Sequence, residues 1–257
     1  MDNTIDVTHG FNTKQPLNHG INFGNFDSRR FNLHLHRRLG DSPNEKEITT
    51  SIPYMQGVVD MSNLLGNRIY QNRTITYTFY RFGATNHGTA RDFQTTITNL
   101  LMIGFDQKLI DSFEPDFHYI GKCQRVNVSD DYNRNRLRID ITFDLHPLKI
   151  ANHTEADDLF DPFNFDIDAF HDGLNFTITE QPSTIQLYNA SQLVLRPLVT
   201  ASGAIELTRA GRSPLELEVG TERTYRDFRL EQGMNTLTLK SLSGNANISF
   251  DWRKERI

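Results

Sequence analysis

Alternating hydrophobic and polar residues run through most of this chain. The clearest case is residues 136–145, where five apolar residues alternate with charged residues and a threonine. A period of two residues puts successive side chains on opposite faces of a strand, so this pattern predicts strands with one buried face. Shorter stretches of the same pattern centre on Phe31, Leu33, Leu35, Ile75, Tyr77, Phe79, Leu174, Phe176, Ile178, Leu237, Leu239, Ile248, Phe250 and Trp252. The chain is therefore predicted to be mainly β.

One stretch of the first half has a helical period instead. Its apolar residues recur at i, i+4, i+7 and i+8, which predicts an amphipathic helix with a single apolar stripe. Thr89 is the expected N-cap, and Gly104 is expected to end the helix. The stripe consists of Phe93, Ile97, Leu100 and Leu101.

Polar, turn-rich segments divide the predicted strands of the first half. Residues 129–135 separate two strands that are expected to form an antiparallel hairpin, and Gly121 in the first of these strands is a candidate β-bulge. Residues 41–46 are expected to form a loop or a hairpin tip. Residues 51–60 contain a proline and a glycine, which favours an edge segment over a central strand.

The pattern also divides the chain into two domains. Residues 151–172 are acidic and aromatic, with little periodicity, and are interpreted as a linker. Residues 1–150 form the predicted N-terminal domain, a β-sandwich-like fold with one helix. Residues 173–257 are a series of short strands with glycines between them, which is typical of a β-sandwich.

Composition limits the classes of function. The chain has 257 residues and a formal net charge of −5, so it has no general attraction for nucleic acid or for an anionic membrane. Cys123 is the only cysteine, which excludes an internal disulfide. The first residues lack the basic and apolar regions of a signal peptide, and no apolar run has the length of a transmembrane helix. No membrane insertion is expected.

The search for a metal site gives two weak candidates. His34 and His36 share one face of a predicted strand, but the other histidines lack metal-ligand spacing relative to them. A second candidate is the group of acidic residues in the predicted linker, which does not match an EF-hand loop because Phe170 and His171 occupy ligand and glycine positions. This group consists of Asp157, Asp158, Asp161, Asp166, Asp168 and Asp172. A polar strand face and a solvated linker are the preferred interpretations.

Catalytic motifs give no stronger signal. A basic neighbour such as Lys122 or Arg125 lowers the pKa of a thiol, but no histidine is placed to pair with Cys123, so a buried structural cysteine is expected. Paired carboxylates for glycoside hydrolysis stay open, since any acidic chain has many pairs. We predict that the protein is not an enzyme, with no catalytic, cofactor-binding or metal-binding residues and no cofactor.

The order of segments in the first half resembles the distal tail (Dit-type) proteins of siphophages that infect Gram-positive bacteria. The most specific segment is the strand at residues 72–80, which begins with Asn and Arg and carries spaced aromatics. Gly57–Asp60 precedes it, and a helix follows it. Further matching segments are residues 108–112, 115–119, 121–123 and 141–149. The resemblance covers most of residues 30–150, and the second half matches only as a sandwich.

This resemblance implies a structural hub of a phage tail tip. Members of the family have a ring-forming N-terminal domain and a galectin-like C-terminal β-sandwich. The implied ring is a homo-hexamer around a channel through which DNA passes transiently. It joins the major tail tube protein to the tail-tip protein and can carry receptor-binding proteins. The implied location is the virion tail tip, after assembly in the host cytoplasm.

Two alternatives to the hub interpretation stay open. One is a carbohydrate-binding module that contacts the host cell wall, since related sandwiches bind sugars. Such sites usually present exposed aromatics, whereas the position of Trp252 at the end of an apolar strand predicts a core residue. The other is a tail-associated hydrolase.

Overall fold

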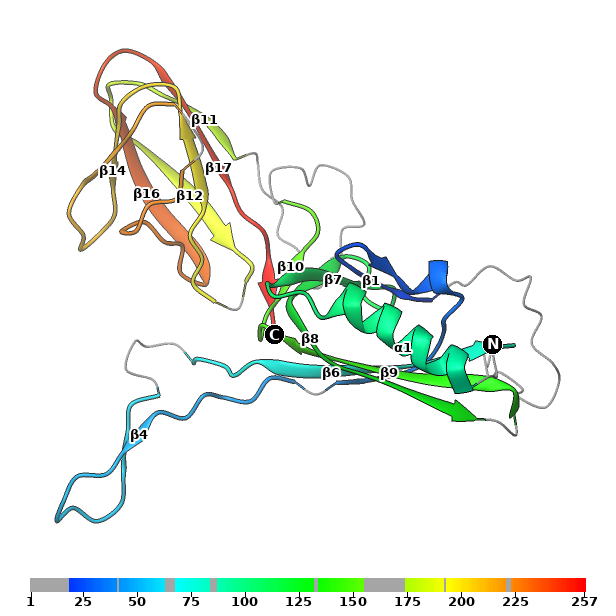
Figure 1. The fold of residues 1–257 in the computed structure, drawn as a ribbon. Helices are drawn as coiled ribbons and strands as arrows, with labels where there is room; N and C mark the ends of the chain where they lie inside the picture. The colour runs from blue at the N-terminus through cyan, green and yellow to red at the C-terminus, as the bar shows by residue number, and fades with distance from the viewer. Residues whose placement is uncertain are drawn as a thin grey trace, which may run out of the picture. The chain divides into compact units, whose positions relative to one another are not determined.

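The computed structural model describes residues 19–40, 42–62, 68–83, 87–131, 134–154, 174–191, 193–220 and 223–257. It separates into two compact units, Met1–Lys149 and Ile150–Ile257 (Figure 1). Each unit has its own hydrophobic core. The prediction of a mainly β fold is confirmed, with α1 (His87–Leu101) as the one α-helix of the described residues. Most of the predicted linker, residues 155–172, lies outside the described residues.

The first unit is built on one large antiparallel sheet. Its strands follow the order β2-β1-β7-β8-β9-β6-β3. Their bounds are β1 (Ile21–Phe23), β2 (Phe26–Asp27), β3 (His34–Gly40), β6 (Arg73–Phe82), β7 (Gln107–Asp111), β8 (Phe117–Asp131) and β9 (Arg136–Leu145). The expected hairpin around residues 129–135 is the β8–β9 pair. A separate two-stranded sheet joins β4 (Thr49–Thr50) to β5 (Val59–Asp60).

The long strand β8 pairs with two other strands of this sheet. It pairs with β7 up to Gly121 and with β9 from Gly121 onward. The bulge lies between Cys123 and Arg125, so the prediction of a bulge at Gly121 is wrong. Gly121 has a different reason to be glycine: a Cβ there would collide with the backbone oxygen of Asp144 and lie 2.7 Å from Cα of Leu145. The absence of a side chain permits this close backbone approach.

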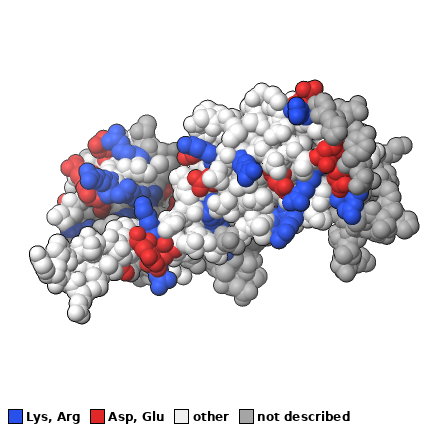
Figure 2. Space-filling model, turned by 60° about the horizontal axis from the view of Figure 1, so that its bottom comes forward, with Lys and Arg blue, Asp and Glu red and all other residues white. Residues whose placement is uncertain are grey.

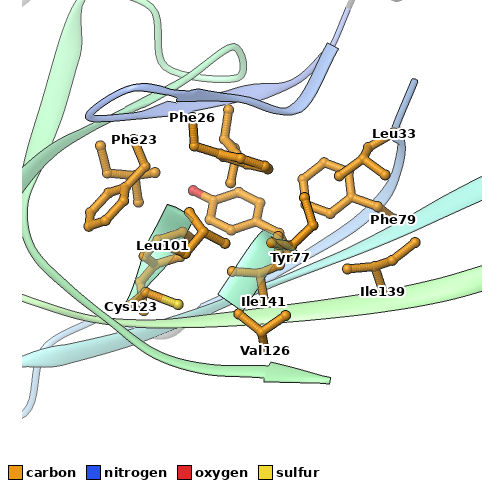
Figure 3. Close-up of a cluster of buried hydrophobic side chains, with 14 of the residues drawn as sticks. Phe23, Phe26, Leu33, Tyr77, Phe79, Leu101, Cys123, Val126, Ile139 and Ile141 are labelled. Atoms are coloured by element: carbon orange, nitrogen blue, oxygen red, sulfur yellow. The ribbon is translucent and has the colours of Figure 1, made fainter. Parts of the chain in front are cut away.

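The core of the first unit lies between the bent sheet and the helix. The inward residues of β6 and β9 have the predicted alternation, and Tyr77 and Phe143 contact each other edge to face at 5.9 Å between ring centroids. Figure 3 shows Tyr77 at the centre of this cluster, with Phe26 and Phe79 beside it. Helix α1 packs against β8 through its apolar stripe, of which Phe93, Ile97 and Leu101 are buried.

Two predicted element boundaries in the first unit are wrong. The helix begins at His87, so Thr89 lies inside it and is not the N-cap. The periodicity missed this start because the first residues of the helix precede the apolar stripe. The strand predicted from Phe31 begins at His34 instead, since residues Ser28–Phe31 form a 3-10 turn that ends with Asn32 in the left-handed region.

The second unit is a sandwich of two antiparallel sheets. The three-stranded sheet has the order β11-β17-β13, and the four-stranded sheet has the order β12-β16-β14-β15. Buried residues from both sheets form its core, with Trp252 beside them, as predicted. The strands of the sandwich are β11 (Asn175–Ile178), β12 (Ser183–Asn189), β13 (Leu198–Ala201), β14 (Ile205–Thr208), β15 (Leu215–Leu217), β16 (Gly233–Ser241) and β17 (Ala246–Asp251). Outside this sandwich, β10 (Lys149–Ala151) pairs with β18 (Glu255–Arg256). The likeness of the sandwich to galectins stays a prediction.

The close approach at Gly121 can be tested with a matched pair of glycine variants. We expect Gly121→Ala to lower the free energy of unfolding by about 1–3 kcal/mol, because the new Cβ forces β8 and β9 apart. Gly104→Ala is the control, since a Cβ at Gly104 meets nothing within 4 Å. Urea unfolding of both variants and the unaltered chain measures the difference. Equal stability of the two variants would contradict this account of Gly121.

Candidate functional site

The histidines that were considered as metal ligands pack against aromatic rings instead. The ring centroid of His34 lies 5.2 Å from that of Phe82, and that of His36 lies 5.0 Å from that of Tyr80. Burial lowers the pKa of His34, which favours its neutral form. Among the described residues, no group of three or more His, Cys, Asp and Glu side chains is placed to hold a metal ion.

The remaining chemical candidates of the sequence give no site in the described part of the chain. Cys123 is buried, and this burial raises the pKa of its thiol to about 11. The protonated thiol is a poor nucleophile at neutral pH. The acidic group from Asp157 to Asp172 lies outside the described residues. No helix of the described residues is long and apolar enough to cross a membrane.

The most distinctive feature of the first unit is a two-stranded projection between β3 and β6, which we call the arm (residues 42–62 and 68–72; Figure 1). At its base, the backbone N–H of Lys46 donates to the oxygen of Ile69 at 2.7 Å. Further out, the N–H of Met61 donates to the oxygen of Ile48 at 2.7 Å, next to the β4–β5 pair. The outgoing segment therefore pairs antiparallel with residues 69–71 at the base and with residues 59–61 farther out.

The tip of the arm lies farther out than the sequence predicted. The sequence predicted a loop or a hairpin tip at residues 41–46. Residues 44–46 pair with residues 69–71, so the hairpin tip does not lie there. The chain turns at residues 51–58, where Tyr54 and Gly57 have positive φ angles of 67° and 84°. Paired strands of two residues each flank this turn. The polar composition of residues 41–46 therefore did not locate the turn, which the chain makes at residues 51–58.

The arm exposes an unusual amount of apolar side chain. Seven of the fifteen large apolar side chains exposed among the described residues belong to it. These are Ile48, Ile52, Tyr54, Met55, Val58, Met61 and Ile69. Residues 48–59 carry no charge at all, and Figure 2 shows the arm at lower left as a mostly uncharged projection. An exposed apolar hairpin with unpaired strand edges is typical of a protein–protein contact.

A buried polar cluster holds the base of the arm in place. Arg38, near the end of β3, has its Nε 2.8 Å from Oδ2 of Asp111. The hydroxyl of Tyr77 donates to the same oxygen at 2.7 Å, and the N–H of Phe113 donates to Oδ1 at 2.9 Å. Asp111 is fully buried. Burial, together with the adjacent carboxylate, raises the pKa of Tyr77, so its hydroxyl stays protonated and donates.

A second carboxylate extends this cluster. Nη2 of Arg38 lies 3.0 Å from Oε2 of Glu114, and Nζ of Lys149 lies 2.6 Å from Oε1. The hydroxyl of Tyr119 also donates to Glu114. Burial alone would raise the pKa of Glu114, but the hydrogen bonds from Lys149 and Tyr119 and the charges of Lys149 and Arg38 hold it below its usual value. The cluster therefore joins the turn after β7 to the strand that enters the arm.

Sequence reasoning missed this cluster. One signal was present: Asp111 follows Leu109 by two residues in a short strand, which places its carboxylate on the buried face. A buried carboxylate requires a cation or several donors. The sequence does not say which of its 27 lysines and arginines supplies that cation.

Comparison with solved structures agrees with this fold, whereas comparison of the sequence alone finds no relative. No protein-family model matches the sequence, and no curated protein is detectably similar to it. Among solved structures, the Dit protein of phage SPP1 superimposes with a TM-score of 0.61, at 14% identity, over 91% of this chain and 98% of that chain. The chain has the fold of a Dit-type distal tail protein. The predicted resemblance is confirmed for the fold.

That structure is described as a paradigm of the hub adsorption apparatus in phages that infect Gram-positive bacteria. The baseplate of phage P2, in its activated conformation with calcium, contains a chain that matches 91% of this one over 97% of its own length, at 12% identity and a TM-score of 0.36.

The shifted pKa of Glu114 leads to a prediction on stability and pH. A carboxylate whose pKa is lowered by folding stabilises the fold above its unfolded pKa, near 4.5, and loses this contribution as the pH falls through its folded value. We expect the free energy of unfolding to drop more steeply below about pH 4.5 in the unaltered chain than in Glu114→Gln. The measurement is urea unfolding at a series of pH values.

The control for this prediction is Glu47→Gln, in which an exposed glutamate of the arm is changed. This variant should follow the pH profile of the unaltered chain. If the acid profiles of Glu114→Gln and Glu47→Gln coincide, the ion pairs of Glu114 do not stabilise the folded state.

Proposed function

We propose that this protein is a structural hub of a phage tail tip. It forms a hexameric ring that joins the tail tube to the tail-tip apparatus and leaves a central channel for the passage of DNA. The observation that carries the proposal is the likeness to the SPP1 Dit structure over nearly the full length of both chains. The role is structural rather than enzymatic, and its place is the tail tip of the virion, after assembly in the host cytoplasm.

The arm supports self-association through the first unit. In a cyclic ring each copy presents two different surfaces, so a projection on one copy contacts a different surface on the next. An apolar, uncharged projection of two short strands suits the role of the inserted element. An isolated two-stranded hairpin is at most marginally stable in water, which favours its docking on a neighbouring copy. We assign ring formation to residues 1–150.

The remaining partners follow from a hub at this position. The proposed ring contacts the major tail tube protein on one side and the tail-tip protein on the other. Residues 173–257 of the second unit, after the proposed linker at 151–172, form the proposed galectin-like sandwich and the place where receptor-binding proteins attach. The hydrolase alternative has no supporting observation in the described residues.

Self-association through the arm can be tested by solution mass. We expect the full chain to form a particle of six-fold mass, and Tyr54→Ser with Val58→Ser to weaken its assembly by roughly 100-fold or more, since each lost apolar contact is worth about 1.5–3 kcal/mol. Native mass spectrometry and analytical ultracentrifugation over a concentration series measure this, and annular particles in negative stain give an independent check.

The matched control alters two exposed apolar residues outside the arm, Met102→Ser with Phe105→Ser. This pair should leave assembly unchanged. The ring proposal would be contradicted if the unaltered chain stayed monomeric at high concentration, both alone and with the tail tube protein. Equal losses of assembly in the two double variants would contradict the proposed role of the arm without contradicting ring formation itself.

A further inference from the structure

The second unit carries a hollow on the outer face of its three-stranded sheet. The volume of this hollow is about 690 Å³. The opposite face of the same sheet supplies buried core residues such as Val199 and Ile248, so the residues that alternate with them face outward. The hollow is lined by Asn175, Phe176, Thr177, Thr200, Ala201, Ser202, Val219, Gly220, Asn247, Ile248 and Ser249.

Strand register arranges the outward side chains in two rows across the sheet. In the first row, Ser249 on the central strand β17 lies opposite Asn175 on β11 and Thr200 on β13. Because neighbouring strands lie about 4.8 Å apart, this row is about 10 Å long. In the second row, Asn247 lies opposite Thr177, and Ser202 follows at the end of β13. All six side chains are neutral hydroxyls or amides.

The two rows differ in how their hydrogen bonds are used. In the second row, the hydroxyl of Thr177 donates to Oδ1 of Asn247 at 2.9 Å, and the N–H of Asn247 donates to the hydroxyl of Ser202 at 2.8 Å. The second row is therefore fixed by internal bonds. In the first row, the side chains of Asn175, Ser249 and Thr200 have no hydrogen-bond partner among the described residues. Their donors and acceptors are available to a ligand.

A short loop forms the wall of the hollow. The N–H of Gly220 donates to the oxygen of Ala201 at 2.9 Å, which holds the loop against the end of β13. Gly220 has a φ of +114°, a conformation that other residues rarely adopt. Beside it, the side chain of Val219 is 60% exposed. The hollow thus offers one apolar contact next to a grid of neutral polar groups.

This chemistry selects a class of ligand. No charged residue lines the hollow, so nothing in it favours an anion or a cation. Hydroxyls both donate and accept, and an amide offers one donor group and one acceptor, which matches the hydroxyls of a sugar. An apolar ligand would leave the three side chains of the first row unpaired, which is costly.

We propose that this hollow is a binding site for a neutral saccharide. The first row hydrogen-bonds the sugar hydroxyls, the second row keeps the floor rigid, and Val219 contacts the apolar edge of the ring. Trp252 provides no aromatic platform for this site, since it is buried in the core. Without an aromatic platform the expected dissociation constants are in the millimolar range. The proposal does not depend on ring formation.

Binding can be mapped on the full chain by NMR. The ¹⁵N-labelled protein is titrated with the methyl glycosides of glucose, galactose, N-acetylglucosamine and rhamnose, one at a time, and with glycerol as a small polyol. We expect at least one glycoside to give saturable shifts confined to β11, β13, β17 and the loop at Val219. No saturable shift with any of these glycosides, or shifts centred on another surface, would overturn the proposal.

Matched variants then test the residues. Thr200→Val with Ser249→Ala removes two hydroxyls of the first row, and the loss of each hydrogen bond should weaken binding roughly two- to tenfold. Thr184→Val with Thr236→Val removes two exposed hydroxyls from the four-stranded sheet and should leave the affinity unchanged. Equal effects of the two pairs would refute the assignment of the first row.

Two further outcomes show whether a sugar or a second copy of the chain occupies the hollow, and whether this site is independent of the proposed hub. If the amides of β11, β13 and β17 shift with protein concentration in the absence of sugar, a second copy of the chain covers the hollow, and the saccharide proposal is wrong. Neither variant pair should change the solution mass. A loss of sugar binding with an unchanged mass therefore separates this site from the proposed hub.

Discussion

The first unit depends on a carboxylate that has no access to water. Asp111 lies at the end of β7, yet its partners Tyr77 and Arg38 belong to β6 and β3, at the far side of the same sheet. Strand pairing alone would leave these elements apart. Removing one partner of a buried charged pair typically costs about 3–5 kcal/mol, because the other charge stays uncompensated. The interaction therefore fixes how the sheet bends over its own core.

The same interaction determines where the arm begins. Arg38 is two residues from the end of β3, and Gly40 is the last residue of that strand to pair with β6. Beyond it the chain leaves the main sheet and runs into the arm. An arm whose root could shift would not present its tip in a defined position. The buried cluster thus connects the packing of the core to the geometry of the surface that we assign to assembly.

Much of the fold could be predicted from the period of the sequence. The alternation of Tyr77 and Ile141 with polar neighbours identified β6 and β9, because burial of one strand face leaves a local pattern. The stripe at Phe93 and Ile97 identified the helix in the same way. The bulge after Cys123 left no such pattern, since it depends on the register between two strands. The boundary at His34 was missed because a 3-10 turn comes before the strand, and the boundary at His87 was missed because the first residues of the helix precede its apolar stripe.

The candidate sites were harder to predict than the fold. The exposed residues of the arm, such as Ile52 and Val58, look like core residues in a sequence, because only the three-dimensional structure shows which apolar side chains are left uncovered. The hollow of the second unit depends on strands that pair across about 75 residues, from Asn175 to Ser249. Its serine, threonine and asparagine residues are ordinary surface residues until the register aligns them.

The low sequence identity to a structure of the same fold has a physical explanation. A period of two residues specifies which face of a strand is buried, but it accepts many apolar residues at each buried position. Two chains can therefore share the course of the backbone over most of their length while few aligned residues agree. Surface features are under no such constraint, so the arm and the hollow must be judged from the chemistry of this chain alone.

The geometry of the arm also bears on the life of the chain before assembly. Exposed apolar hairpins can pair with other copies in a wrong register, and such pairing leads to aggregation. Here the regular strands near the tip are only two residues long, Thr49–Thr50 and Val59–Asp60. Pro53 and the positive φ angles of Tyr54 and Gly57 interrupt the backbone between them. These short strands offer little continuous edge for incorrect strand pairing. A newly made chain can therefore expose an apolar surface and still avoid forming fibres.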